Sequence, residues 1–463
     1  QLALDTSAVL DVASTTQGFL PPRMTEAQRD AIHLPAAGLI LWCTDCGSNG
    51  ELQVFNGTAY TNMSGGAESV STPFTNITQL VPDIDGEATA DYSGWSVSLS
   101  SDGSTLAIGA IGNDGNGSNS GHVRIYQNVS GTWTKIGADI DGEDAGDESG
   151  YSVSLSSDGS TLAIGARYND ANGANSGHVR IYENVSGTWT QLGADIDGEA
   201  AGDYSGQSVS LSSDGSTLAI GAPYNDANGA SSGHVRIYEN VSGTWTKIGA
   251  DIDGEATADY SGWSVSLSSD GSTLAIGAIG NDANGSNSGH VRVFENVSGT
   301  WTQLGADIDG EAAGDYSGQS VSLSSDGSIL AIGANRNDEN GSASGHVRVF
   351  EYYSTSWTQI GSDIDGEAAD DYSGYSVSLS ADGTILAIGA YTNDGNGNYA
   401  GHVRVYRYLY AAWTRLGRDI DGEALGDESG YSVSLSSDGT IIAIGAKNNS
   451  GSGSAAGHVR VYR

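Results

Sequence analysis

The sequence predicts an all-β fold: a seven-bladed β-propeller preceded by a small β-rich N-terminal segment. The tetrapeptide Asp-Ile-Asp-Gly begins at seven positions spaced 56 residues apart, from Asp83 to Asp419. Such regular self-similarity is typical of repeat architectures. The 463 residues include 68 Gly but only 6 Pro and 2 Met, with Ser, Thr, Val, Ile and Tyr abundant between the glycines. This composition favours strands and tight turns over helices.

Four short strands are expected in each repeat. In the third copy they are residues 207–213, 216–222, 233–239 and 244–250, joined by segments rich in Gly, Asn, Asp and Ser. Small residues dominate the first two strands, whereas Tyr and Trp occur in the last two. Because the sheets of a propeller converge at its axis, small side chains suit the inner strands. Four antiparallel strands in each of seven repeats predict a β-propeller.

The two ends of the repeat array predict how the ring closes. The chain ends at Arg463, so the seventh repeat lacks its fourth strand. The stretch Phe74–Leu80 lies just ahead of the first Asp-Ile-Asp-Gly, where the other repeats carry that strand. We therefore expect this stretch to supply the outer strand of the last blade, which removes two free sheet edges.

Three strings carry a resemblance to a known family: SGYSVSLSSDG, LAIGAPYND and SGHVRIY. They resemble the FG-GAP repeats of integrin α-subunit propellers and of bacterial and algal surface proteins, and the resemblance covers residues 74–463. Two features depart from that family. Pro follows Gly-Ala only at Pro223, and the loop that often holds calcium between the first two strands is reduced to Ser-Asp-Gly. Calcium sites of the integrin type are therefore not carried over.

The first 66 residues form a separate segment, followed by a linker over 67–73. The string AVLDVASTTQGFLPPRMTEAQRDAI resembles a segment found near the N-termini of secreted surface and fibre-like proteins of the Bacteroidetes. This resemblance implies an anchoring or assembly role on the outside of a bacterium. One short helix is expected over Glu26–His33, with Thr25 as its N-terminal cap.

Charge and cysteine content indicate which partners are excluded and in which compartment the protein is found. The 57 acidic and 18 basic residues give a formal net charge of −39, which disfavours nucleic acid and anionic lipid as partners. No apolar run approaches the roughly 20 residues of a membrane helix, so direct membrane insertion is not expected. We expect a signal peptide to have been removed ahead of Gln1, and the protein to be extracellular. Cys43 and Cys46, the only cysteines, are expected to form a disulfide across a turn, with two free thiols as the alternative.

The loops Asp-Ile-Asp-Gly-Glu and Asn-Asp-Ala-Asn-Gly are expected to lie side by side on one face of the propeller. A representative acidic set in them is Asp139, Asp141, Glu143, Asp147 and Asp170. Oxygen ligands at alternate positions suit calcium. The alternative is that these carboxylates cap turns and solvate the face.

One histidine and one arginine recur in the third strand of every repeat. The histidines run from His122 to His458, and the arginines from Arg124 to Arg460. Because neighbouring copies are separated by a whole blade, the histidines cannot converge on one ion. We expect the histidines to bond to the adjoining turn and the arginines to pair with acidic groups.

The two residues after Gly-Ala differ between most copies and lie on the same acidic face. Variation at these positions indicates either a ligand-binding rim or drift in exposed loops. The candidate rim residues are Arg167, Tyr168, Tyr224, Arg336, Tyr391 and Lys447.

The sequence contains no nucleophile elbow, phosphate loop, zinc-ligand spacing or carboxylate pair that stands apart from the repeat. We therefore expect a non-catalytic surface protein, structural and adhesive, that forms the subunit of a surface fibre and self-associates through its N-terminal segment or contacts other surface proteins. The main alternative is a monomeric, calcium-dependent module that recognises glycan or protein. A secreted enzyme is the third alternative.

Overall fold

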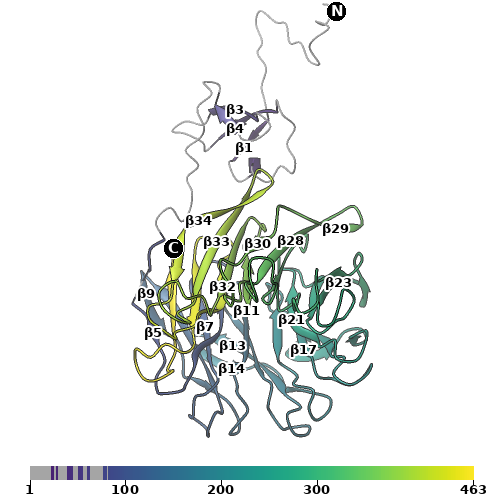
Figure 1. The fold of residues 1–463 in the computed structure, drawn as a ribbon. Helices are drawn as coiled ribbons and strands as arrows, with labels where there is room; N and C mark the ends of the chain where they lie inside the picture. Colours follow the sequence, from purple (N-terminus) through teal and green to yellow (C-terminus); the bar gives the residue numbers. More distant parts are fainter. Residues whose placement is uncertain are drawn as a thin grey trace, which may run out of the picture. The chain divides into compact units, whose positions relative to one another are not determined.

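The computed structural model describes residues 22–25, 28–29, 39–44, 51–55, 60–62, 77–80 and 82–463. The chain divides into two compact units. The first is Gln1–Thr72, and the second comprises Pro73–Tyr408 and Ala412–Arg463. The second unit is a ring of β-sheets, one for each repeat (Figure 1). None of the helical segments in the described ranges has the length and hydropathy to cross a membrane.

The N-terminal unit contains one small sheet, as the sequence predicts. Its strands β1 (Arg23–Met24), β2 (Ile40–Cys43), β3 (Glu51–Phe55) and β4 (Tyr60–Asn62) follow one another in space. The pair β1 and β2 is parallel, and the other two pairs are antiparallel.

A reciprocal pair of hydrogen bonds confirms Thr25 as a helix cap. The Gln28 amide donates to Thr25 Oγ1 at 3.2 Å, and the Thr25 amide donates to Gln28 Oε1 at 3.0 Å. Gln28 and Arg29 are helical, and the rest of the expected helix Glu26–His33 lies outside the described residues. The buried Arg29 donates to Gln53 Oε1 at 2.7 Å, which ties this turn to β3.

The third blade illustrates the sheet that each repeat forms. Strands β16 (Ser208–Leu211), β17 (Thr217–Ala222), β18 (His234–Val241) and β19 (Thr244–Lys247) pair in that order, all antiparallel. The outer strand was expected as one segment, but it is interrupted after Lys247. A further piece, β20 (Ile252–Asp253), pairs with the start of β18. Gly249, with φ of 76°, lies in the interruption, so the backbone leaves the extended conformation there.

The other blades repeat this plan. The innermost strands are β6 (Ser93–Leu99), β11 (Ser152–Leu155), β21 (Ser261–Leu267), β26 (Ser320–Leu323), β31 (Ser376–Leu379) and β35 (Ser429–Leu435). The second strands are β7 (Thr105–Ala110), β12 (Thr161–Ala166), β22 (Thr273–Ala278), β27 (Ile329–Ala334), β32 (Ile385–Ala390) and β36 (Ile442–Ala446). The third strands are β8 (His122–Val129), β13 (His178–Val185), β23 (His290–Val297), β28 (His346–Tyr353), β33 (His402–Leu409) and β37 (His458–Tyr462). The outer strands are β9 (Thr132–Lys135) with β10 (Ile140–Asp141), β14 (Thr188–Gln191) with β15 (Ile196–Asp197), β24 (Thr300–Gln303) with β25 (Ile308–Asp309), β29 (Ser356–Gln359) with β30 (Ile364–Asp365), and the continuous β34 (Ala412–Asp421).

The hydrophobic core lies between neighbouring blades. In the second strand of the third blade, Leu218 and Ile220 pack against the preceding blade, whereas Ala219 packs against the following one. In the second strands, the large side chains of one blade therefore meet the central alanine of the preceding blade, such as Ala163. Because every position of β17 is buried, this strand has no solvent-exposed face.

Serine hydroxyls of the innermost strands link each blade to the next. Ser208 Oγ donates to the carbonyl of Gly262 at 2.9 Å, and Ser154 Oγ accepts from the amide of Leu211 at 3.0 Å. Equivalent pairs occur at every junction, including the one between the last and first blades, where Ser432 Oγ donates to the Gly94 carbonyl at 2.8 Å. Near the axis, where side chains must be small, the serines thus satisfy backbone groups of the neighbouring sheet.

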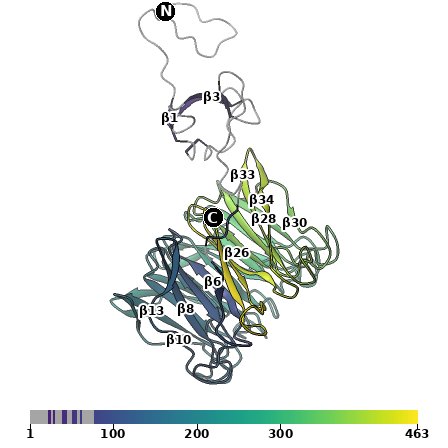
Figure 2. The same ribbon diagram turned by 90° about the vertical axis from the view of Figure 1, so that its left-hand side faces the viewer.

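The latch, described over residues 77–80 and 82–85 and including β5 (Ile84–Asp85), closes the ring as predicted; residues 74–76 of the expected stretch lie outside the described residues. Ile84 pairs with Val459, and the amides and carbonyls of Thr78 and Arg463 exchange hydrogen bonds of 2.9 and 3.0 Å. The first and last blades also share a core cluster that joins Ile84 to Val459 and Leu106 to Ala443. Figure 2 shows the blue first blade beside yellow strands of the last.

Candidate functional site

The loop face is the end of the propeller that carries the blade-to-blade loops, such as 253–261, and the loops between second and third strands, such as 223–233. As predicted, these loops lie side by side. The Asn228 side chain donates to the carbonyls of Gly254 at 2.8 Å and Glu255 at 3.0 Å. One asparagine in each of the first six blades, and Ser452 in the seventh, therefore fixes the loop that leads to the next blade.

The five acidic residues of the predicted calcium set do not form one cluster. Asp147, which is 3 % exposed, accepts from the Asp144 amide and from Asn169 Nδ2, both at 3.0 Å, and so caps a turn. Asp170 likewise accepts from the Asn175 amide at 2.7 Å.

The remaining three residues of that set are divided between two neighbouring blades. Asp139 forms an ion pair with Lys135 at 2.7 Å, and Asp141 Oδ1 lies 4.0 Å from His122 Nδ1. Glu143 faces the next blade, where its Oε2 lies 3.7 Å from His178 Nδ1.

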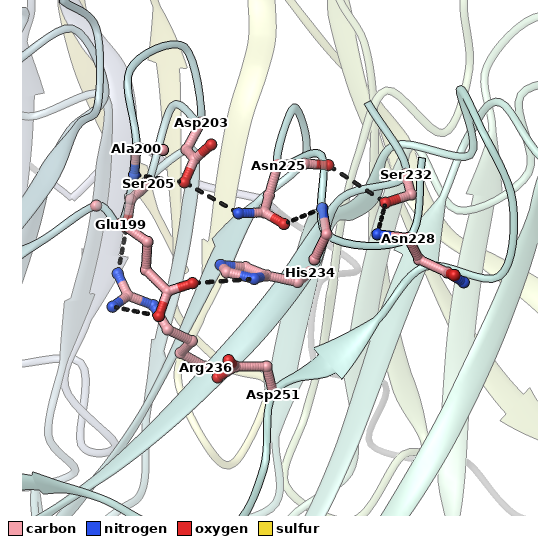
Figure 3. A network of polar contacts seen from close by, with 12 residues as sticks. Glu199, Ala200, Asp203, Ser205, Asn225, Asn228, Ser232, His234, Arg236 and Asp251 are labelled. Atoms are coloured by element: carbon pink, nitrogen blue, oxygen red, sulfur yellow. Dashed lines mark hydrogen bonds and ion pairs between the residues drawn. The ribbon is translucent and has the colours of Figure 1, made fainter. Parts of the chain in front are cut away.

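Each acidic cluster on the loop face is built around the repeated histidine of the third strand. In the third blade, His234 Nδ1 lies 3.9 Å from Glu199 Oε2, and Arg236 Nη1 lies 3.9 Å from the other oxygen of Glu199 (Figure 3). Asp251, from the interruption of the outer strand, completes the group, and one ligand atom from each of Glu199, His234 and Asp251 lies within 4.8 Å of the others. Nitrogen and carboxylate oxygen ligands at this spacing are able to hold a metal ion.

The histidine nitrogens do not bond to the turn, which corrects the expectation from sequence. Among the described residues, neither ring nitrogen has a hydrogen-bond partner in His178, His234, His290, His346 or His458. Burial and the Arg236 guanidinium lower the pKa of His234 to about 4. The imidazole is therefore neutral at pH 7 and carries an unused lone pair.

The arginines pair with acidic groups, as the sequence predicts, and most of them also hydrogen-bond to the preceding blade. Arg236 Nη2 donates to the carbonyl of Asp197, in the preceding blade, at 2.7 Å and to Ser205 Oγ at 3.3 Å. The ion pair between Arg236 and Glu199 is longer than these two hydrogen bonds. The guanidinium also lies 5.7 Å from the centre of the Tyr238 ring.

The cluster of the fifth blade has one more acidic residue than those of the first, second, third and seventh blades. It contains Glu311, Glu339, His346 and Asp363, whereas the clusters of the second and third blades contain two carboxylates each. Glu339 occupies the position held by Ala171 in the second blade and Ala227 in the third. This difference was visible in the sequence, but the contribution of Glu339 to the cluster depends on how closely its loop approaches His346.

The six candidate rim residues belong to one continuous series of ring and cation contacts on the loop face. Arg167 lies 3.7 Å from the centre of the Tyr151 ring, and Lys447 lies 4.4 Å from that of Tyr431. Further contacts extend the series through Tyr168, Tyr224, Tyr391 and Arg336. The Glu428 carboxylate pairs with Lys447 at 2.7 Å.

Sequence reasoning missed a group of residues on the innermost strands, of which Trp95, Tyr151, Tyr375 and Tyr431 contact one another or this series. They occupy the variable position of the repeated string Ser-Gly-x-Ser-Val-Ser-Leu, immediately before or within the innermost strand. The seven residues are Trp95, Tyr151, Gln207, Trp263, Gln319, Tyr375 and Tyr431. Trp95 contacts both Tyr151 and Tyr431, at centroid distances of 5.4 and 4.8 Å. Burial, together with Glu428 and Tyr372, raises the pKa of Tyr391 to about 12, so this phenol stays neutral.

The opposite end of the axis is narrow. A cavity of about 140 Å³ is lined there by the last leucine of each innermost strand and by the small residues that follow, such as Leu211 and Ser213. Backbone amides and carbonyls of these small residues form a closed ring of hydrogen bonds. The ring passes from Ser101 through Ser157, Ser213, Ser269, Ser325, Ala381 and Ser437 back to Ser101.

Cys43 is disulfide-bonded. Its expected partner, Cys46, lies outside the described residues.

Comparison with known proteins identifies two kinds of segment. A model of the FG-GAP repeat matches residues 74–126, 135–182, 195–238, 247–294, 307–350 and 363–406, which together make up more than half of the chain. A model described as a phage tail like trimerisation region matches residues 3–78. No curated protein matches the sequence.

Solved structures with similar folds are numerous. One is the Kuenenia stuttgartiensis hydrazine synthase, with a TM-score of 0.52 and 15 % sequence identity. The similarity covers 77 % of this chain and 93 % of that one. At this identity the likeness concerns the fold alone.

Proposed function

Since the chain belongs to the FG-GAP repeat family and matches a trimerisation region ahead of its repeats, we propose that three copies join through residues 3–78 to form an adhesive surface-fibre subunit. In this arrangement the N-terminal region assembles the fibre. Each chain contributes one propeller to the exterior.

The observation that carries the proposal is the continuity between the trimerisation region and the ring. The matched region ends at residue 78, and Thr78 already belongs to the latch, where it exchanges hydrogen bonds with Arg463. Force on the N-terminal region would therefore act directly on a strand of the last blade. This attachment is suited to a propeller that is carried on the outside of a fibre.

We infer that the aromatic and cationic series on the loop face binds the partner. Flat rings such as Tyr224 and Tyr391 and charged groups such as Arg336 are suited to glycans or to polar protein surfaces. These positions also differ between repeats, whereas the scaffold positions around them are nearly constant. The seven similar loops form a repeated surface and not a single set of catalytic residues. We therefore propose a role in binding without catalysis.

An extracellular location is part of the proposal. The disulfide at Cys43 supports it, because such bonds persist in oxidising compartments. The net charge of −39 is compatible with a secreted protein that remains dispersed.

Light scattering on the intact chain and on a version that begins at Ser69 tests the assembly. The intact chain should have three times the 47.3 kDa mass of one chain. The shortened version keeps the latch and should be monomeric. An intact chain that is monomeric at all concentrations would contradict the proposal.

The acidic clusters of the loop face favour a second candidate, a monomeric module whose recognition depends on calcium. Repeating the mass measurement with calcium and with a chelator separates the two. A monomer that binds its partner only with calcium would support this second candidate.

A further inference from the structure

We propose that the fifth blade binds a divalent transition-metal ion of the Zn²⁺ or Mn²⁺ class through Glu311, Glu339, His346 and Asp363. This site is independent of the assembly proposed above, because all four residues belong to the propeller. It also differs from the calcium set considered from sequence, since none of its residues belongs to that set.

The geometry brings four potential ligands together. One ligand atom from each residue lies within 4.8 Å of all the others. Ligands of a tetrahedral zinc ion are separated by about 3.3 Å, given bond lengths near 2.0 Å. Glu311 and Glu339 are exposed, so side-chain rotation is able to close the remaining gap.

His346 presents buried, unpartnered nitrogen atoms at the cluster. Its side chain is 1 % exposed, and within the described ranges neither ring nitrogen has a hydrogen-bond partner. Nδ1 is directed toward the cluster, 3.8 Å from Glu311 Oε2. A buried nitrogen without a partner is unfavourable, and coordination of a metal would satisfy it.

The local charge favours a cation in this blade more than in others. Three carboxylates face one guanidinium, that of Arg348, whose Nη1 lies 3.8 Å from Glu311 Oε1. Asp363 accepts from the neutral side chain of Gln359 at 2.5 Å, whereas Asp139 and Asp251 are paired with the ammonium groups of Lys135 and Lys247.

The donor set determines the class of ion. One imidazole with carboxylates suits zinc, manganese and similar ions, whereas calcium prefers six to eight oxygen ligands. Calcium should therefore compete poorly at this site.

The test uses the intact, untagged chain, freed of metal with a chelator and then titrated with Zn²⁺ by calorimetry. Retained metal is also counted by elemental analysis after gel filtration. Wild type should bind one Zn²⁺ tightly, and an equal concentration of Ca²⁺ should not displace it. Glu339→Ala installs the residue found in the second and third blades, on an exposed loop, and should weaken binding at least about tenfold. The metal-free thermal stability of the variant should match that of wild type.

A second variant tests the reverse change, the addition of the fourth ligand to another blade. Ala171→Glu places a third carboxylate beside Glu143, His178 and Asp195 in the second blade, where Asp195 also accepts from a glutamine, Gln191. This variant should bind two Zn²⁺ per chain. Wild type without tight Zn²⁺, an unchanged affinity in Glu339→Ala, or displacement by equimolar Ca²⁺ would each overturn the proposal. A stoichiometry that stays at one in Ala171→Glu would contradict the role given to the fourth ligand.

Discussion

The Ser-Asp-Gly turn between the first two strands shows how individual residues stabilise a short loop. Asp214 Oδ1 accepts from the amide and hydroxyl of Ser216, at 2.9 and 2.7 Å, and from Ser212 Oγ at 2.7 Å. Burial opposes ionisation of this carboxyl, but the hydrogen bonds from Ser216 and Ser212 prevail and lower its pKa. The turn is therefore stabilised by an ionised aspartate and needs no cation.

The variant Asp214→Asn should reduce the free energy of unfolding at pH 7 by about 0.5–1 kcal/mol, a small effect because the carboxylate is solvent-exposed. Since the folded-state pKa is depressed, the contribution is present above the usual aspartate pKa and is lost as pH falls through the folded value. Urea unfolding at pH 7 and at pH 2.5 should therefore show a difference between wild type and variant that shrinks in acid. An equal difference at both pH values would refute this account.

The elements of the blade were predictable where a pattern repeats. Alternation of Ser with Val and Leu identified the innermost strand, and the missing fourth strand of the last repeat identified the latch. The interruption at Gly249 and the serine bridges between blades were not predictable, because both depend on the distance between neighbouring sheets. The same applies to the site: the loops were placed correctly, but the unpartnered nitrogens of His234 and its counterparts appear only once the blade is packed.

Close approach of adjacent blades explains why the second strand carries glycine. A Cβ added at Gly221 would collide with the carbonyl oxygen of Gly262 in the next blade and with Ser208 Oγ. Gly221→Ala should thus reduce the free energy of unfolding by about 3 kcal/mol or prevent folding. Gly243→Ala is the control, because no atom lies within 4 Å of its added Cβ. Its φ of 84° should limit the loss to about 1 kcal/mol. Thermal denaturation that ranks the two variants in the reverse order would contradict this explanation.

At the scale of the whole molecule, the ring depends on a strand from the far end of the chain. The latch pairs with β37 and covers an edge that would otherwise be free. A version that begins at Glu87 lacks the latch and should aggregate through that edge, as seen by size-exclusion chromatography. The version that begins at Ser69 keeps the latch and should remain disperse. Equal behaviour of the two versions would show that the latch is dispensable.

We propose that the N-terminal region displays three seven-bladed propellers in one particle. Electron microscopy of the intact chain tests it most directly, because rings and their number per particle are seen together. We expect particles that contain three propellers joined through their N-terminal regions, and single propellers when the chain begins at Ser69. Intact chains that appear only as separate single rings would contradict it.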